Sequence, residues 1–220
     1  MIKRITNELK RHAPFTAFGA LTGIIIMAVI VLGNVPSGIS QTVFYTLHPI
    51  HVVLSALVTT AMYIRYRKAK IWLAILIGWT GSIGIATISD AVIPYLGGAL
   101  LHVEMGFHVP FVETAKMPFI EIEKWKIVNF AALIGIAIGY WRHITKFPHA
   151  GHVLLSVWAS LFYFTAFGTI NWIPLLPFVF LFLFLAVWIP CCTSDIVYPL
   201  LFVGRGPELP LQDRTKSQTS

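Results

Sequence analysis

The residues best suited to metal chemistry lie in a short histidine motif that occurs twice in the chain. Each copy spaces two histidines and a serine three and four residues apart, so in a helix all three share one face. The two copies, 101 residues apart, are His48, His51 and Ser55, and His149, His152 and Ser156. Imidazole nitrogen is a common ligand of divalent transition metals, so each copy predicts part of a metal site.

A second repeated motif supplies a carboxylate to each histidine set. Asp90 is followed four residues later by Pro94, and Asp195 by Pro199. Because proline has no N–H group, we expect each of these prolines to leave the aspartate carbonyl without its helical partner. Mixed nitrogen and oxygen ligands suit a borderline divalent cation, with zinc first and manganese, iron or cobalt as alternatives.

Other roles are open to these residues. A histidine pair of this spacing can bond helix-end carbonyls, and an aspartate beside histidine can stabilise packing or relay protons. Ionisable groups held within a membrane are functional by default, which favours a metal site. Cys191 lies one turn before Asp195 and could add a soft ligand, although a packing role is favoured for it.

Composition indicates an integral membrane protein that is all-α. Hydrophobic residues make up 57% of the chain and charged residues 11%, whereas soluble domains carry about 25% charged residues. Six apolar stretches are long enough to cross a bilayer as helices. They lie near residues 15–33, 42–64, 71–100, 127–141, 151–169 and 173–203. Prolines and glycines predict that the third and sixth are broken.

The basic residues predict the orientation. Thirteen of the 16 lysines and arginines fall on one side of the six stretches. This predicts that both termini are cytoplasmic, and the expected location is a plasma or inner membrane. The net charge of +7 is then explained by anionic lipid, and it gives no support to nucleic-acid binding.

The repeated motifs predict an internal duplication. A third, weaker match relates residues 18–24 to residues 130–136, and all three matches keep their order. Three helices per half is an odd number, so the second half would cross the membrane inverted, a plan that recurs in transporters. The expected divisions are a basic N-terminus (1–14), a first repeat (15–100), an outer loop (101–126), a second repeat (127–203) and a cytoplasmic tail (204–220).

The outer loop contains further candidate ligands among apolar residues. They are His102, Glu104, His108 and Glu113. Two interpretations are equally open: a re-entrant or interfacial segment that gathers cations, or a solvated linker.

These features favour a transporter or channel for a divalent cation, with one His-His-Asp cluster toward the outer side and one toward the inner side. The first alternative is a membrane-embedded zinc hydrolase acting on a lipid ester or amide, and an enzyme is the less favoured class. The second is a haem-binding electron carrier, against which the histidine spacing argues. No phosphate loop or dinucleotide motif occurs. The expected partners are lipid and metal ions, and a homo-oligomer is left open.

Overall fold

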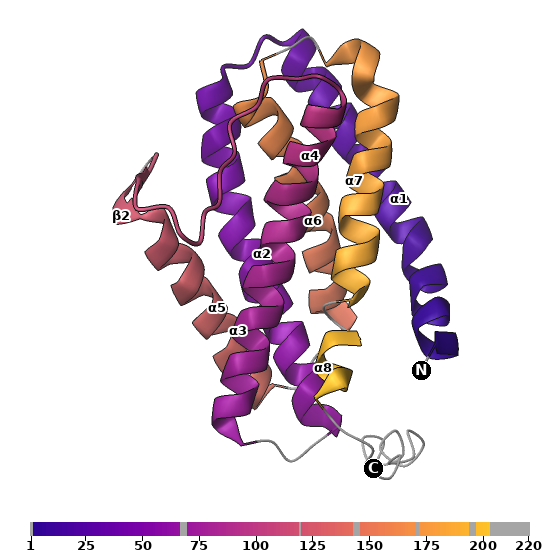
Figure 1. Cartoon of the computed structure of the whole chain (residues 1–220), viewed down its shortest axis with the longest axis vertical. Helices are drawn as coiled ribbons and strands as arrows, with labels where there is room; N and C mark the ends of the chain where they lie inside the picture. The colour runs from indigo at the N-terminus through magenta and orange to yellow at the C-terminus, as the bar shows by residue number, and fades with distance from the viewer. Residues whose placement is uncertain are drawn as a thin grey trace.

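Long helices packed side by side form nearly all of this computed structural model (Figure 1), which describes residues 2–66, 70–118, 120–142, 146–169, 172–193 and 197–202. The helices are α1 (Ile2–Leu32), α2 (Ser37–Tyr66), α3 (Ile71–Thr87), α4 (Ile93–Leu100), α5 (Lys124–Trp141), α6 (Lys146–Phe167), α7 (Leu176–Cys192) and α8 (Tyr198–Leu201). A π-helical turn, η1 (Ile88–Val92), joins α3 to α4, and a 3-10 turn, η2 (Ile173–Leu175), precedes α7. Strands β1 (Lys116–Met117) and β2 (Ile120–Glu123) form a small antiparallel hairpin before α5.

Five helical segments are long and apolar enough to cross a membrane. They are His12–Leu32, Ser37–Ile64, Ile71–Leu100, Ala150–Phe167 and Ile173–Cys191. Helix α5, which carries Lys124 and Lys126 in its first turn, is not among them. Large apolar side chains on the outward faces, such as Phe18, Val29 and Trp72, are more than half exposed, as contact with lipid requires.

The third apolar stretch is broken, as the sequence predicts. In η1 the Ile93 N–H donates to the Ile88 carbonyl, five residues back instead of four, and Pro94 follows in the first turn of α4. In the sixth stretch α7 ends at Cys192 and α8 begins at Tyr198, and residues 194–196 lie outside the described part of the chain.

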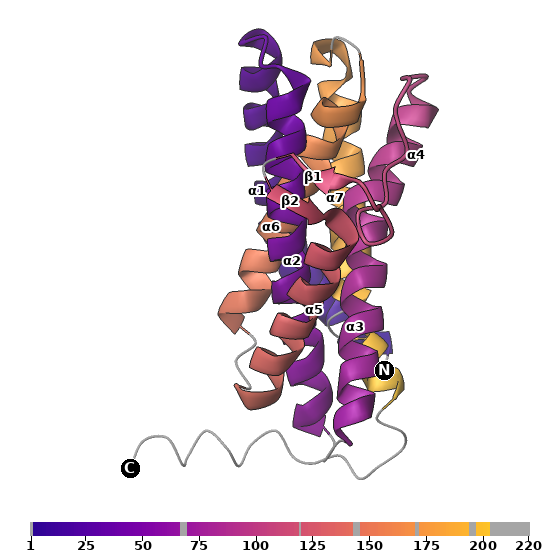
Figure 2. The ribbon, with the colours of Figure 1, turned by 90° about the vertical axis from the view of Figure 1, so that its left-hand side faces the viewer.

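Helix α2 occupies the centre of the bundle and packs against α3, α5 and α6, whereas α6 also contacts α1 and α7. Figures 1 and 2 show successive long helices running in alternate directions, with the start of α1 and helix α8 at the same end. The contact between α2 and α5 is especially close. A Cβ atom added at Gly135 would lie 2.2 Å from the Val53 carbonyl oxygen, and one at Gly139 would lie 2.5 Å from that of Leu57. Small residues at such crossings let two backbones approach in a membrane.

Substitution of Gly135 by leucine should therefore destabilise the bundle. Forcing extra atoms into a packed contact costs about 1–3 kcal/mol, and here the obstacle is backbone that cannot turn aside. We expect Gly135→Leu to lower the Tm of detergent-purified protein by several degrees. Gly84→Leu is the matched control, because a Cβ at Gly84 meets nothing within 4 Å. Equal Tm values for the two variants would contradict this account of the crossing.

Candidate metal centre

A single carboxylate, that of Asp90 in η1, lies at the centre of a buried polar cluster. Its Oδ2 atom lies 2.9 Å from His48 Nδ1 and 2.7 Å from His51 Nδ1. An ionised carboxylate has no hydrogen to donate, so both ring nitrogens must carry the hydrogen of these bonds. The aspartate thus lies within hydrogen-bond reach of the first histidine pair, as the motif spacing predicts.

The second oxygen of Asp90 is also fully used. Oδ1 accepts hydrogen bonds from Ser89 Oγ at 2.7 Å and from Ser156 Oγ at 2.9 Å. Asp90, Ser89, His48, His51 and Ser156 are each no more than 1% exposed. Four donors from α2, η1 and α6 therefore replace the water that this carboxylate would otherwise bind.

Residues of the second histidine motif join this same cluster. Besides the bond from Ser156, the rings of His51 and His152 lie edge to face with centroids 5.4 Å apart. The sequence interpretation placed the two histidine sets in separate outer and inner clusters, whereas His152 and Ser156 contact the first set directly. The His149 side chain and Asp195 lie outside the described residues.

The starting points of the helices explain this convergence. In the predicted stretches, 42–64 and 151–169, each histidine motif lies near the beginning of its helix. Helix α2 instead begins at Ser37 and α6 at Lys146, so His51 and Ser156 both lie near the middle of their helices. Antiparallel helices that cross near their middles bring mid-helix residues together.

The backbone break beside Asp90 has its own partner in α6. We expected Pro94 to free the carbonyl of Asp90. In the π turn, however, a backbone N–H bonds the carbonyl five residues earlier instead of four. The residue five positions before Pro94 is Ser89, so the missing N–H of Pro94 affects the Ser89 carbonyl. The Ser89 carbonyl lies 2.9 Å from Ser160 Oγ, whose single hydrogen it shares with the Ser156 carbonyl at 2.7 Å. Ser89 and Ser160 were absent from the predicted ligand set. Ser160 lies one helical turn beyond Ser156 on the same face, and that spacing is a signal that could have found it.

The remaining candidates lie at the edge of the cluster. Ser55 is buried one turn beyond His51 on α2. Cys191 is also buried, and its Sγ lies 3.7 Å from Ser156 Oγ, so it contacts the group that holds Asp90.

His48, His51 and Asp90 together are able to hold a metal ion. One ligand atom from each of His48, His51 and Asp90 lies within 4.8 Å of the others, and no other such group occurs among the described residues. Zinc takes nitrogen and oxygen ligands at about 2.0–2.2 Å and accepts three protein ligands with a fourth position open. The Nε2 atom of His48 is buried and has no hydrogen-bond partner within the described part of the chain. The donor set therefore fits a borderline divalent cation.

The outer loop is fastened to the bundle. Glu113 Oε2 accepts hydrogen bonds from Lys124 Nζ at 2.8 Å and from the Tyr45 hydroxyl at 3.1 Å, and Glu113 Oε1 lies 3.2 Å from His108 Nδ1. Burial raises the pKa of the Glu113 carboxyl, but its bond to Lys124 and the charges of Lys124 and His108 outweigh burial and hold the pKa below its usual value. A solvated linker does not describe this segment. Glu113 is already paired with Lys124, so this carboxylate is not free to bind another cation.

Two of the outer-loop candidates have no part in this network. Glu104 is exposed. His102 adopts a positive φ of 56° at the end of α4, where the Val103 N–H closes the helix on the Gly98 carbonyl.

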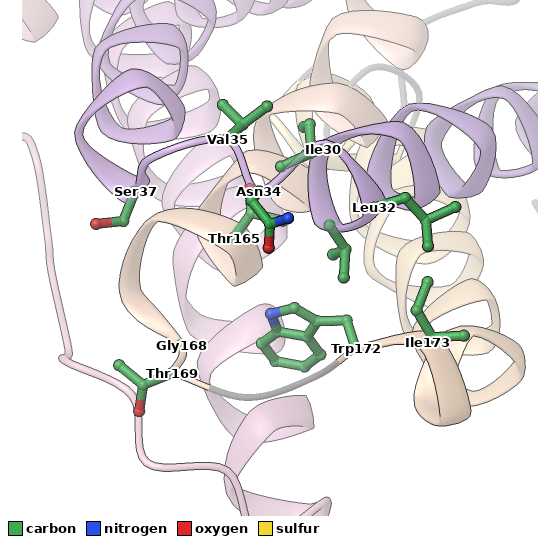
Figure 3. A pocket seen from close by; sticks show the side chains of 11 residues that line it. Ile30, Leu32, Asn34, Val35, Ser37, Thr165, Gly168, Thr169, Trp172 and Ile173 are labelled. Carbon is green, nitrogen blue, oxygen red and sulfur yellow. The ribbon is translucent and has the colours of Figure 1, made fainter.

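A pocket of about 660 Å³ lies at the bundle end where α1 and α6 finish (Figure 3). Its lining comprises Ile30, Val31, Leu32, Asn34, Val35, Ser37, Thr165, Gly168, Thr169, Trp172 and Ile173. None of these side chains is charged and none belongs to the cluster around Asp90. The pocket is therefore separate from the candidate metal centre.

The fold and the cluster define a membrane-compatible helical bundle that contains a candidate metal centre. Comparison with protein-family models, with curated proteins and with solved structures finds no match. The chemistry of the cluster itself therefore has to carry the functional argument.

Loss of the Ser160 hydroxyl should destabilise the protein although Ser160 is not itself a candidate ligand. Ser160→Ala leaves the buried Ser89 carbonyl without this donor, and an unsatisfied buried acceptor costs about 1–3 kcal/mol. Ser40→Ala is the control, because Ser40 Oγ is buried with no partner in the described residues and its removal breaks no bond. Thermal unfolding of both variants in one detergent provides the measurement. A Tm for Ser160→Ala equal to that of Ser40→Ala would rule out the proposed role of the hydroxyl.

Proposed function

We propose that this chain is an integral membrane protein that carries a divalent metal cation across the bilayer through the site formed by His48, His51 and Asp90. The observation that carries the proposal is a buried His-His-Asp group near the middle of helices long enough to span a membrane. Transporters of related plan bind their substrates near the bilayer midplane, between repeats.

The energetic cost of the cluster supports a functional site over a structural one. A charged side chain at the centre of a bilayer costs about 2.5–3.5 kcal/mol or more. Apolar residues of similar volume often replace a buried ion pair without loss of stability. A cation that replaces the two Nδ1 hydrogens would meet two imidazoles and one carboxylate, which are suitable ligands for zinc and also for manganese, iron or cobalt.

An inverted repeat is part of the proposal. If α1, α2 and α3 correspond to α5, α6 and α7, the observed contacts among these six helices have counterparts. The α2–α5 contact corresponds to the α6–α1 contact, the α2–α3 contact to the α6–α7 contact, and the α1–α7 contact to the α5–α3 contact. Corresponding helices also run in opposite directions in Figure 1, which an axis in the membrane plane requires. In this arrangement α5 is a sixth span.

The orientation follows from the same arrangement. The bundle end that holds the start of α1, the end of α2 and the start of α6 also carries Lys10, Lys70, Arg142 and Lys146. Positive charge concentrates on the cytoplasmic side, so we place both termini there. We also propose, from the repeated motif, that His149, His152, Asp195 and Cys191 supply ligands to the ion on its path.

Metal binding and flux of the Asp90→Asn variant test the proposal. After removal of bound metal with a chelator, the wild type should bind Zn²⁺, and the substitution should weaken binding and slow Zn²⁺ flux into liposomes by about tenfold or more, since a lost ligand charge is not replaced. Mn²⁺, Fe²⁺ and Co²⁺ serve as competing ions. Glu121→Gln is the control, because it removes a carboxylate from an exposed ion pair with Lys116.

Three results would contradict transport. If the wild type does not bind Zn²⁺, the remaining explanations for the His48–His51–Asp90 site are a proton relay or a structural cluster. Binding without flux, together with lipid cleavage that Asp90→Asn abolishes, would favour the membrane-embedded hydrolase. Equal flux in Asp90→Asn and Glu121→Gln would remove Asp90 from the path of the ion.

A further inference from the structure

An aromatic layer separates the candidate metal centre from the outer end of the bundle. The Phe44 ring stacks on the His48 ring with centroids 5.6 Å apart and packs edge to face on Tyr163 at 5.4 Å and on Phe167 at 5.7 Å. Phe44 and Tyr163 are fully buried. These rings close the direct approach to His48 between α2 and α6.

The polar side of this aromatic layer is held by the outer segment, defined here as residues 103–115. The Tyr163 hydroxyl accepts the His108 N–H at 2.9 Å and donates to the Gly106 carbonyl at 3.1 Å. The Phe167 ring stacks on the His108 ring with centroids 4.1 Å apart. Two of the rings that close the site are therefore positioned by a segment with no regular secondary structure.

Glu113 is the point where the outer segment is fastened to two helices. It accepts hydrogen bonds from Tyr45 of α2 and from Lys124 at the start of α5, and the Lys124 ammonium also lies 3.9 Å from the centre of the Tyr45 ring. Lys124 is only 9% exposed. Charge-assisted bonds of this kind are stronger than neutral ones, so their loss would free the segment from the side chains of Tyr45 and Lys124. The segment would then stay joined to the start of α5 only through backbone bonds, from the Lys124 N–H to the Ala115 carbonyl at 3.0 Å and from the Trp125 N–H to the Glu113 carbonyl at 3.1 Å.

We propose that the outer segment and the rings of Phe44, Tyr163 and Phe167 form a gate over the His48–His51–Asp90 site, and that Glu113 is its latch. The structure holds the gate closed. Opening separates the segment from Tyr45 and Lys124, frees Tyr163 and Phe167 to move, and exposes His48 to the outer solution. The inference rests on the proposed function for the identity of the ion, but access to the site can be measured without any metal.

Cys191 is a natural reporter of this access, since its Sγ lies beside Ser156 in the buried cluster. The chain has two cysteines, so Cys192→Ala leaves Cys191 as the single thiol. A small membrane-impermeant methanethiosulfonate reagent, applied separately to each face of sealed vesicles, measures its labelling rate. In this background Glu113→Gln should raise the rate about tenfold from the face that carries the outer segment, as loss of a charged hydrogen bond predicts.

Four further variants make the test specific. Phe44→Ala should raise the rate as Glu113→Gln does, and Tyr45→Phe, which removes only one hydroxyl, should raise it less. Glu121→Gln is the matched control, because Glu121 lies in the same loop but pairs with exposed Lys116. Cys191→Ser should abolish labelling.

The outcomes separate the gate from the proposed transport function. Equal rates for Glu113→Gln and Glu121→Gln, or an equal rise from both faces with a lowered Tm, would overturn the gate. If Tyr45→Phe and Phe44→Ala are folded and also label at the rate of the parent, the gate is wrong even if Glu113→Gln fails to fold. A labelling rise in a protein that binds no Zn²⁺ would keep the gate and discard metal transport, whereas Zn²⁺ flux without that rise would do the reverse.

Discussion

The hydrogen bonding of one buried carboxylate determines much of this structure. Asp90 is fully buried in a bundle whose outer faces are apolar, so its charge cannot be hydrated and has to be met by donors from the protein. Two imidazoles of α2 serve one oxygen, and two hydroxyls, from Ser89 and from Ser156 of α6, serve the other. Because the donors come from both halves of the chain, the requirement of Asp90 fixes the position of α6 relative to α2.

The backbone at Asp90 imposes a second requirement that α6 also meets. A π turn followed by Pro94 leaves the carbonyl of Ser89 without a helical donor, and such a group must be satisfied inside a membrane. Ser160 supplies the donor one turn beyond Ser156, so a single face of α6 satisfies both the side chain and the backbone of η1. The break in the third apolar stretch and the serines of α6 are therefore parts of one arrangement.

Much of this could be predicted from the sequence, because local periodicity and helix adjacency carry the information. The apolar stretches, the break near Pro94 and the approach of Asp90 to His48 and His51 all follow from spacing along single helices and their neighbours. The meeting of His152 and Ser156 with that cluster could not be predicted, because it depends on where α2 and α6 start and how they cross. The helices extend beyond their apolar stretches to Ser37 and Lys146, which moves both motifs toward mid-helix. The role of Glu113 was equally hidden, since its partners Tyr45 and Lys124 are 68 and 11 residues away in sequence.

The repeated motifs and the outer segment place different demands on the molecule. A site built from both halves changes whenever the halves move, since the bond from Ser156 to Asp90 and the contact between His51 and His152 join them directly. The outer segment follows α4 and precedes α5 in the chain. It fastens α2, α5 and α6 to one another through Tyr45, Lys124 and Tyr163. Two nearly equivalent halves would favour neither direction of opening. In the proposed gate the outer segment breaks that equivalence, because its contacts with Tyr45, Lys124 and Tyr163 hold the site closed on one side and have to be broken before it opens there.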